Sequence, residues 1–415
     1  MMEETMLTRR KFVTQITGGT VAYAAFGNSS AGRVLGANDR VRFGLIGHGG
    51  RGDALLKAAL RCTNVEAVAV ADVYTRRLDE ARQLAPAIQT YQDFRKLLDD
   101  RSIDAVLIAT PQHQHALNFI PALQAGKDIY QEKTMAFNPD HARRMRQAFE
   151  GSGRVVQVGI QSITSSAFTQ ACALATPARM GTITALHTHH YRNAPHGGWM
   201  RQIPPDCDTQ HVDWKAFEGE ATPHPFDPQR VINWRFYWDY SGGNVFENMV
   251  HQVGFWAKVL NLQIPRRVTM TGGNYLSPQM QPPDTMDVSM VQPEKILFTW
   301  NSMFGNDFYG EGEDLLLGDK GTLWCKELET VRYVPQGQQN SEAAGKSSTA
   351  GPDIVSAGEQ THAHLQNFFD CVRSRKEPNC PFEIGYRSAI ACQMALASYQ
   401  RGHSVEWDEQ RAMIV

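Results

Sequence analysis

The chain has 415 residues, of which 42% are hydrophobic and 20% charged, so it is long enough to bury a sizeable core in two domains. Its 41 basic and 43 acidic residues give a formal net charge of −2. This balance offers no electrostatic basis for binding nucleic acid or anionic lipid and favours a small, neutral or mildly polar ligand. The seven cysteines form no CxxC pair, so we expect mostly buried thiols, with disulfides left open if the chain is exported.

The N-terminus has the layout of a twin-arginine export signal. Arg9 and Arg10 precede a short, mildly apolar stretch at residues 13–26, and small residues follow at 29–31. The stretch is too short and too polar to span a membrane. A disordered basic tail is the alternative. We predict that residues 1–36 are a signal and linker and that the mature protein is periplasmic or otherwise exported.

The next 120 residues alternate between strand-like and helical composition. Strand-like runs occupy residues 41–47, 65–72, 103–110, 128–131 and 155–159, and helical stretches occupy 53–61, 75–84, 117–124 and 139–150. Alternation at this spacing implies right-handed crossovers and a doubly wound parallel sheet. We therefore predict an α/β fold with a first domain at residues 37–158.

The remainder of the chain has a different pattern. Strand-like runs lie at 183–191, 267–271, 296–300, 315–317 and 322–325, with few helices between them. This favours an α+β domain at residues 159–415 with an open, largely antiparallel sheet. Residues 336–359 are rich in Gln, Ser, Gly and Ala and predict a mobile surface excursion. Two late helices, at 362–373 and 386–401, are expected to pack back onto the first domain.

A glycine fingerprint follows the first strand. The run Gly47-His48-Gly49-Gly50-Arg51-Gly52 is GxGxxG at the opening of a helix, which suits a tight turn, close backbone approach to a pyrophosphate and an anion at the helix N-terminus. Asp72 ends the second strand and is placed to hydrogen-bond the ribose hydroxyls. An acid there favours NAD. Arg76 and Arg77 lie close enough in sequence to leave NADP possible.

Three further segments give a resemblance to a family. ATPQHQHA at 109–116, AGKDIYQEK at 125–133 and WRFYWDYSGGNVFENMVHQVGFW at 234–256 resemble motifs of the glucose-fructose oxidoreductase, inositol dehydrogenase and MocA (Gfo/Idh/MocA) family. The resemblance covers essentially the whole mature chain. It implies an N-terminal Rossmann domain, a tightly bound NAD and oxidation of a sugar or sugar derivative. The cofactor contacts that it predicts are Gly47, His48, Gly49, Gly50, Arg51, Gly52, Asp72, Thr110, Pro111, His113, His115, Glu132 and Gln161.

The same resemblance places three catalytic residues. Dehydrogenation of a carbinol needs a base for the hydroxyl proton and a positive charge near the developing alkoxide. Lys133 is expected beside the nicotinamide, where it supplies charge and exchanges a proton. His251 is the expected base. Glu247 lies four residues before His251, which on a helix puts both on one face, able to contact the same sugar.

Substrate contacts are predicted on a histidine-rich strand and on aromatic residues. Alternation along the strand at 187–192 places His189 and Tyr191 on the face expected to meet substrate, although sheet packing would explain them equally well. Trp234 and Tyr237 are candidate walls for a sugar ring or, alternatively, core residues. No HxxEH or HExxH spacing occurs, so no metal site is predicted.

Three departures from the family pattern leave the reaction open. Thr134 follows Lys133 where the family has proline, Glu247 replaces the usual aspartate, and Gly254 stands where a second aspartate is common. The alternatives are a redox-neutral NAD-dependent glycosidase, which oxidises, eliminates, adds water and re-reduces, and a sugar-sugar oxidoreductase. Export would favour a retained cofactor in either case. By resemblance, we expect a homodimer or homotetramer.

Overall fold

The computed structural model describes residues 40–337, 354–355 and 360–415, and these belong to one compact unit. The predicted signal at 1–36 and nearly all of the predicted excursion at 336–359 lie outside the described residues. Within the described ranges, no helix is both long enough and apolar enough to cross a membrane.

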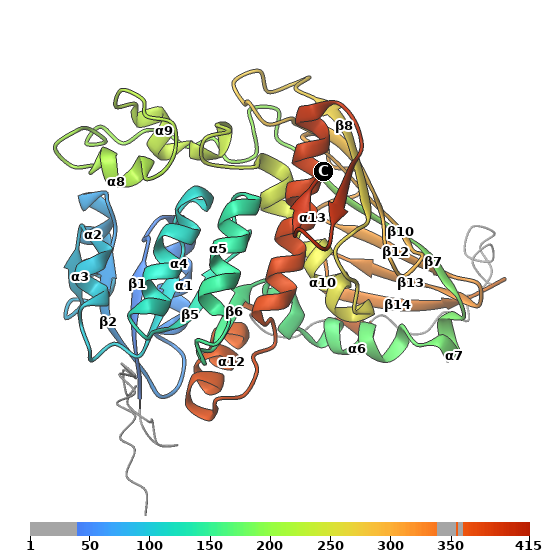
Figure 1. Ribbon diagram of the computed structural model, residues 1–415, viewed down its shortest axis with the longest axis horizontal. Helices are drawn as coiled ribbons and strands as arrows, with labels where there is room; N and C mark the ends of the chain where they lie inside the picture. Colours follow the sequence, from blue (N-terminus) through green and yellow to red (C-terminus); the bar gives the residue numbers. More distant parts are fainter. Residues whose placement is uncertain (1–39, 338–353, 356–359) are drawn as a thin grey trace, which may run out of the picture. The chain divides into compact units, whose positions relative to one another are not determined.

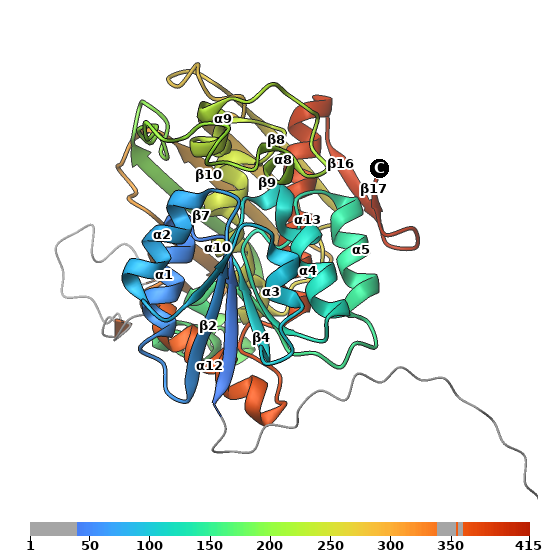
Figure 2. The same ribbon diagram turned by 90° about the vertical axis from the view of Figure 1, so that its left-hand side faces the viewer.

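Residues 41–159 form a parallel sheet with helices on both faces (Figures 1 and 2). Its strand order is β3-β2-β1-β4-β5-β6, and every neighbouring pair is parallel. The strands are β1 Val41–Ile46, β2 Val65–Ala71, β3 Gln89–Tyr91, β4 Ala105–Ile108, β5 Asp128–Glu132 and β6 Val156–Gly159. The helices are α1 Gly50–Ala59, α2 Thr75–Leu84, α3 Phe94–Leu98, α4 His115–Gln124 and α5 Pro139–Phe149, with short 3-10 turns at Gln112–Gln114 and Gln161–Thr164. The predicted doubly wound sheet is confirmed.

Local sequence explains most of these boundaries. The strand β4 is an uninterrupted, fully buried Ala-Val-Leu-Ile run, as expected for a central parallel strand. The helix α5 begins where Asn138 accepts a hydrogen bond from the backbone N of His141, with Pro139 in the first turn. The short elements β3 and α3 were not predicted, because three to five residues carry too little periodicity to be recognised.

The second sheet has 11 strands and is mixed but mostly antiparallel, as predicted. Its order is β15-β14-β13-β12-β7-β10-β9-β8-β16-β17, and β11 pairs with β7 off this path. The pair β7 and β10 is parallel. The bounds are β7 Ile183–Asn193, β8 Arg267–Gly273, β9 Thr285–Val291, β10 Leu297–Met303, β11 Gly305–Asn306, β12 Glu313–Gly318, β13 Gly321–Lys326, β14 Thr330–Pro335, β15 Ile354–Val355, β16 Val405–Asp408 and β17 Met413–Ile414.

Helices join the second sheet to the first. The helices α10 (Val250–Leu260) and α13 (Phe382–Arg401) pack together, and α13 also contacts β8 on one side and α5 and β6 on the other (Figure 1). The helices α6 (Ser166–Leu174) and α7 (Pro177–Met180) pack near β14 and β13. The helix α12 (Gln360–Ser374) returns to the first sheet, where it packs on α1 and β1.

A long connection between β7 and α10 lies over the first sheet. We call residues 194–232 the cap segment; it contains the short helices α8 (Trp214–Glu218) and α9 (Pro228–Ile232). Figures 1 and 2 both place α8 and α9 above the end of the first sheet at which α2 begins. A 3-10 turn at Trp234–Phe236 and a π-helical turn at Val245–Met249 then lead into α10.

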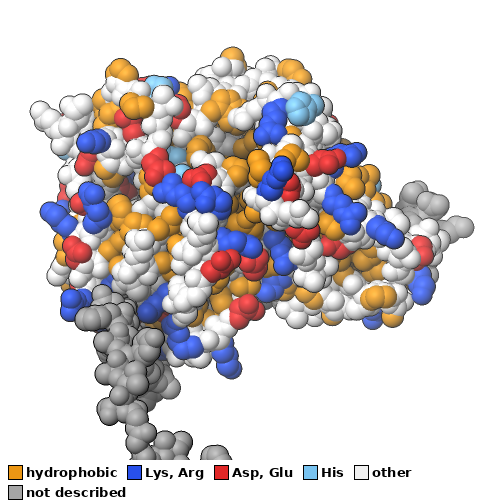
Figure 3. Space-filling view, in the orientation of Figure 1, with side chains coloured by type: hydrophobic (Ala, Val, Ile, Leu, Met, Phe, Trp, Pro, Cys, Tyr) orange, Lys and Arg blue, Asp and Glu red, His pale blue; other side chains and the backbone are white. Residues whose placement is uncertain are grey.

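The surface and the thiols agree with the composition. Basic and acidic side chains are interspersed on the face shown in Figure 3, as a near-zero net charge predicts. All seven cysteines are free, and all except Cys172 are buried. The prediction of mostly buried thiols is confirmed.

Candidate active site

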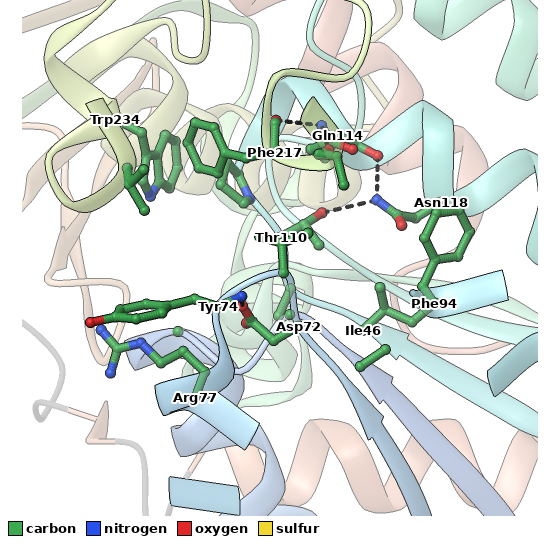
Figure 4. A pocket seen from close by; sticks show the side chains of 18 of the residues that line it. Ile46, Asp72, Tyr74, Arg77, Phe94, Thr110, Gln114, Asn118, Phe217 and Trp234 are labelled. Carbon is green, nitrogen blue, oxygen red and sulfur yellow. Dashed lines mark hydrogen bonds between the residues drawn. The ribbon is translucent and has the colours of Figure 1, made fainter. Parts of the chain in front are cut away.

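A cavity of about 460 Å³ crosses the carboxyl edge of the first sheet (Figure 4). Its floor follows the strand order, from Gln92 beyond β3 through Asp72, Gly47 and Thr110 to Lys133 after β5. The facing wall is formed by Arg201, Asp213, Ala216, Phe217, Gly219, Val231, Ile232, Trp234, Arg235 and Glu247. Because a doubly wound sheet binds dinucleotides across this edge, the cavity lies where such a ligand belongs.

The glycine turn has the shape that a pyrophosphate requires. Gly47 has a φ of +89°, and a Cβ there would lie 2.8 Å from the backbone N of Thr110. A Cβ on Gly52 would lie 2.0 Å from the carbonyl oxygen of Gly47, so helix and strand pack too closely for any side chain. A Cβ on Gly49 would meet nothing within 4 Å. The open space is thus at the N-terminus of α1, where backbone N–H groups favour an anion.

These glycines give a matched pair of substitutions. Gly49→Ala should leave the melting temperature unchanged but weaken NAD binding about 10-fold or more, because its methyl group would intrude only on a bound pyrophosphate. Gly52→Ala should instead lower the melting temperature, since its methyl group collides with backbone. Titration with NADH fluorescence and thermal unfolding of both variants measure the two effects. Equal NAD affinity of Gly49→Ala and the unchanged protein would contradict this account.

Asp72 directly follows β2 at the carboxyl edge of the first sheet and is fixed there by two hydrogen bonds. Its carboxylate accepts hydrogen bonds from the backbone N of His48 (2.7 Å) and of Tyr74 (2.9 Å). Burial raises its pKa, although both hydrogen bonds act in the opposite direction. Arg76 pairs with Asp206 and Glu80 and does not line the cavity, whereas Arg77 does line it.

A charged cluster closes the end of the cavity beyond β5. Lys133 Nζ lies 2.8 Å from Glu247 Oε2, and both side chains are almost fully buried. Glu247 Oε1 accepts a hydrogen bond from Gln112 (2.6 Å) and lies 3.2 Å from Arg235 Nε. Burial alone would raise the pKa of Glu247, but the charges of Arg235 and Lys133 outweigh it and hold the pKa at about 2. Glu247 is therefore a carboxylate that fixes two cations.

Glu132 organises the neighbouring polar groups. Its Oε1 lies 2.7 Å from Arg51 Nε and accepts a hydrogen bond from Gln161 Nε2 at 3.2 Å. Arg51 and Glu132 line the cavity, whereas Gln161 lies at the second cavity described next. Together they connect the N-terminus of α1 with the ends of β5 and β6.

His251 and Glu247 line different cavities, although Glu247 lies close enough for its charge to act on His251. Their predicted contact with one substrate stays a prediction. His251 lines a second cavity of about 260 Å³ with Gln161, Ser162, His190, Arg192, Asn248, Gln252, Glu311, Glu327 and Gln360. Burial, reinforced by the charges of Lys133 and Arg51, lowers the pKa of His251 to about 3. Its ring is therefore neutral at pH 7.

Three histidines predicted to contact the cofactor do not line the cavity. His113 Nε2 lies 2.7 Å from the carbonyl oxygen of Phe217, and His115 bonds the carbonyl oxygens of Thr134 (2.7 Å) and Thr110 (3.0 Å). The side chain of His48 is buried, and its backbone N donates to Asp72. The rings of His113 and His115 bond the backbone around the site, so the predicted cofactor contacts of these two residues are corrected, whereas that of His48 stays a prediction. Pro111 and Thr110 do line it.

The predicted face of the histidine-rich strand is also wrong. Thr188 and His190 point to the buried side of β7, where His190 lines the second cavity. His189 and Tyr191 lie on the opposite face, where His189 stacks on Tyr309 with ring centroids 4.2 Å apart. His189 also bonds Asn301 of β10 at 2.7 Å. This face of the sheet therefore packs its rings against neighbouring strands and lines neither cavity.

Of the two aromatic residues that were predicted to contact substrate, only one lines the main cavity. Trp234 lines the main cavity, with the guanidinium of Arg235 4.1 Å from its ring centroid. Tyr237 instead packs in an aromatic cluster under Arg230, 4.4 Å from that guanidinium, so its predicted substrate contact is wrong. Within the described ranges, no group of three or more His, Cys, Asp or Glu side chains is arranged to hold a metal ion.

Some site residues were missed. Gln112 and Arg235 both contact Glu247, although each stands inside a motif that the sequence displayed. Arg201 had no local signal, because it comes from the cap segment. At Gly254, a Cβ would lie 2.4 Å from Ile160 Cδ1, so the position has no room for the aspartate that the family often carries there.

Known proteins match this geometry. Residues 41–160 match the family model described as oxidoreductase family, NAD-binding Rossmann fold (GFO_IDH_MocA). Residues 41–160 are therefore similar to the NAD-binding domain of this oxidoreductase family. The chain is 23% identical over 373 residues to an inositol 2-dehydrogenase of Salmonella paratyphi B, covering 88% of this chain and 96% of that protein.

Two further matches extend the comparison. Over 98 residues, the chain is 41% identical to a glycosyl hydrolase family 109 protein of Stenotrophomonas maltophilia, covering 21% and 22% of the two chains. A solved structure of levoglucosan dehydrogenase with NADH and levoglucosan has a TM-score of 0.69 at 17% identity, covering 89% and 99%. This structural similarity shows that the chain and levoglucosan dehydrogenase share a fold.

Proposed function

We propose that this oxidoreductase transfers a hydride between bound NAD and a carbinol of a sugar or sugar derivative. The observation that carries the proposal is the single cavity that runs from the glycine turn and Asp72 to the buried Lys133–Glu247 pair. The glycine turn would hold the pyrophosphate, Asp72 the adenosine ribose, and the end beyond β5 the nicotinamide. When bound, the nicotinamide ring would accept the hydride.

The residues at that end supply charge and proton handling. Lys133 stabilises the alkoxide that develops as the hydroxyl proton leaves, and Glu247 keeps the ammonium in place. His251 offers a neutral ring as proton acceptor. Because Lys133 contributes to the lowered pKa of His251, the two groups are within electrostatic range, and we place the reacting carbinol between them.

A polar, ring-shaped substrate fits the surroundings. Asn248, His190 and Arg192 line the second cavity beside His251 and are available to the remaining hydroxyl groups. The Nε2 atom of His190 is buried and has no hydrogen-bond partner among the described residues. Trp234 offers an aromatic face to the C–H surface of a sugar. The inositol and levoglucosan named for the two similar proteins support this substrate class.

A redox-neutral glycosidase is the second candidate, favoured by the local similarity to a glycosyl hydrolase family 109 protein. One experiment separates the candidates: release the nucleotide from purified protein by denaturation, and follow its redox state in native protein offered sugars and glycosides. A free sugar that reduces bound NAD supports the dehydrogenase. Cleavage of a glycoside without net NADH supports the glycosidase, and oxidation of one sugar coupled to reduction of another indicates sugar-sugar oxidoreduction. Absence of any bound or binding NAD would overturn all three.

We further propose that the protein is exported and oligomeric. Arg9-Arg10 and the short apolar stretch after them support twin-arginine export, and retention of an Arg9→Lys/Arg10→Lys double variant in the cytoplasm tests it. A homodimer or homotetramer is supported by the face of the second sheet that bears His189 and Tyr191. On the neighbouring strands of this face, Val291 and Leu297 are half-exposed. The mass in solution, measured by light scattering, tests that proposal.

A further inference from the structure

The cap segment is attached to the first sheet on both sides of the cavity. On the β2 side, Asp213 N donates to Val73 O and Thr75 N donates to His211 O, both at 2.9 Å. On the α4 side, Gln114 Nε2 donates to the carbonyl oxygens of Ala216 (3.0 Å) and Phe217 (2.6 Å). A ligand in the cavity would therefore lie beneath a bridge of backbone.

The β2 side also carries an ion-pair latch. Asp206 of the cap segment accepts hydrogen bonds from Tyr74 Oη (2.7 Å) and from Arg76 (2.9 Å). Arg76 and Asp206 are both substantially solvent-exposed, so the latch is weak and able to open. This ion pair is more exposed than the contacts of Gln114 and is therefore broken more readily, although Tyr74 and Val212 beside it are buried.

Arg201 projects from the cap segment toward the glycine turn. A Cβ built on Gly50 would lie 3.6 Å from both terminal nitrogens of Arg201, at the N-terminus of α1. Its backbone is fixed by buried Asn233, which accepts from Arg201 N (2.7 Å) and donates to Arg201 O (3.0 Å). Across residues 40–337, 354–355 and 360–415, its guanidinium has no hydrogen-bond or ion-pair partner.

The surroundings of that guanidinium repel a cation. Burial and the charges of Arg235 and Arg77 all lower the pKa of Arg201. Arg201 is exposed and lies at a helix N-terminus that itself favours negative charge, within electrostatic range of two other arginines and of Glu247. A dianion there would pair with its guanidinium.

We propose that the cap segment retains the bound dinucleotide, with Arg201 closing over its pyrophosphate from the side opposite the glycine turn. The inference rests on the proposed function, since it concerns the same cofactor. It gives the cap segment a role separate from hydride transfer: the nucleotide leaves only when the latch on the β2 side opens. A cofactor so held would cycle within one active site.

Arg201→Gln tests the charged contact. NADH release from the loaded protein, followed by fluorescence after adding excess NAD, should become about 10-fold faster or more, because a charge-assisted bond is lost. The association rate should change little, and the melting temperature of the nucleotide-free protein should not fall. Arg267→Gln is the matched control, because Arg267 pairs with Glu406 at an exposed edge of the second sheet. Release from that variant should be unchanged.

Asp206→Asn tests the latch and has a different signature. Opening becomes easier without loss of a nucleotide contact, so the association and release rates should both rise several-fold while the affinity changes less. Unchanged rates in both Arg201→Gln and Asp206→Asn would overturn the cap proposal while leaving NAD-dependent chemistry intact. If the unsubstituted protein bound no NAD(H), the proposed function itself would fail, and the cap proposal with it.

Discussion

Lys133→Met should lower the rate of hydride transfer by about 1,000-fold, because a positioned charge and a proton-exchanging group are both lost. NAD should remain bound, since the glycine turn, Asp72 and the cap segment are untouched. Single-turnover reduction of bound NAD by the active sugar measures the rate, and nucleotide released by denaturation measures occupancy. Lys57→Met serves as the control, because Lys57 lies on the exposed side of α1 and pairs only with Asp53 among the described residues.

Removal of Lys133 also leaves Glu247 with one fewer cation, which could lower activity through misfolding alone. The melting temperature of Lys133→Met, measured beside its turnover, separates the two causes, because Arg235 still pairs with Glu247 in this variant. Normal turnover in Lys133→Met would remove Lys133 from the chemistry.

The second large effect is a loss of stability in mild acid. Burial is the main cause that lowers the pKa of His113 and His364 to about 4 and of His190 to about 3, from an ordinary value of 6.5. Below pH 6.5 these histidines become protonated in the unfolded chain but stay neutral in the folded protein. The free energy of unfolding is therefore fully retained above pH 6.5 and falls as the pH decreases. Each should cost about 2 kcal/mol by pH 5, together about 6 kcal/mol. Buried Asp314, whose pKa is raised to about 7 by burial, takes up a proton over the same range and offsets part of this loss.

Urea unfolding at pH 7.5, 6 and 5 measures this effect. His364 is fully buried and bonds Thr164 and the carbonyl oxygen of Val158, so His364→Gln should reduce the pH slope by about one proton. The carboxylate of Glu247, whose pKa is held at about 2, affects stability only below about pH 4.5 and so acts in a separate window. Unchanged stability between pH 7.5 and 5 would contradict the proposed histidine mechanism.

The sequence was most informative where function depends on neighbouring residues. The glycine turn, Asp72 and Lys133 each follow a recognisable strand, and parallel strands bring their carboxyl ends to one edge. The cavity floor could therefore be predicted. The opposite wall of the cavity could not be predicted. Arg201 lies near Gly50 although more than 140 residues separate them in sequence, and no local sequence pattern marks Arg201 as a site residue.

The errors have a common physical origin. Alternation along β7 shows that two faces differ, but the sequence does not say which face α10 will cover, and His189 was assigned to the wrong one. His113 and His115 follow a cofactor-lining strand, yet their rings form hydrogen bonds with backbone carbonyl oxygens.

The packing of α12 on the first sheet affects the order in which the chain folds during synthesis. Phe369 packs against Phe43 with ring centroids 5.3 Å apart, and Leu365 and Phe368 complete the same core. The nucleotide-binding domain therefore exposes apolar surface until α12 has left the ribosome. We expect cofactor loading to follow the synthesis of α12, and a truncation before Gln360 should yield an aggregating chain instead of a free-standing nucleotide-binding domain.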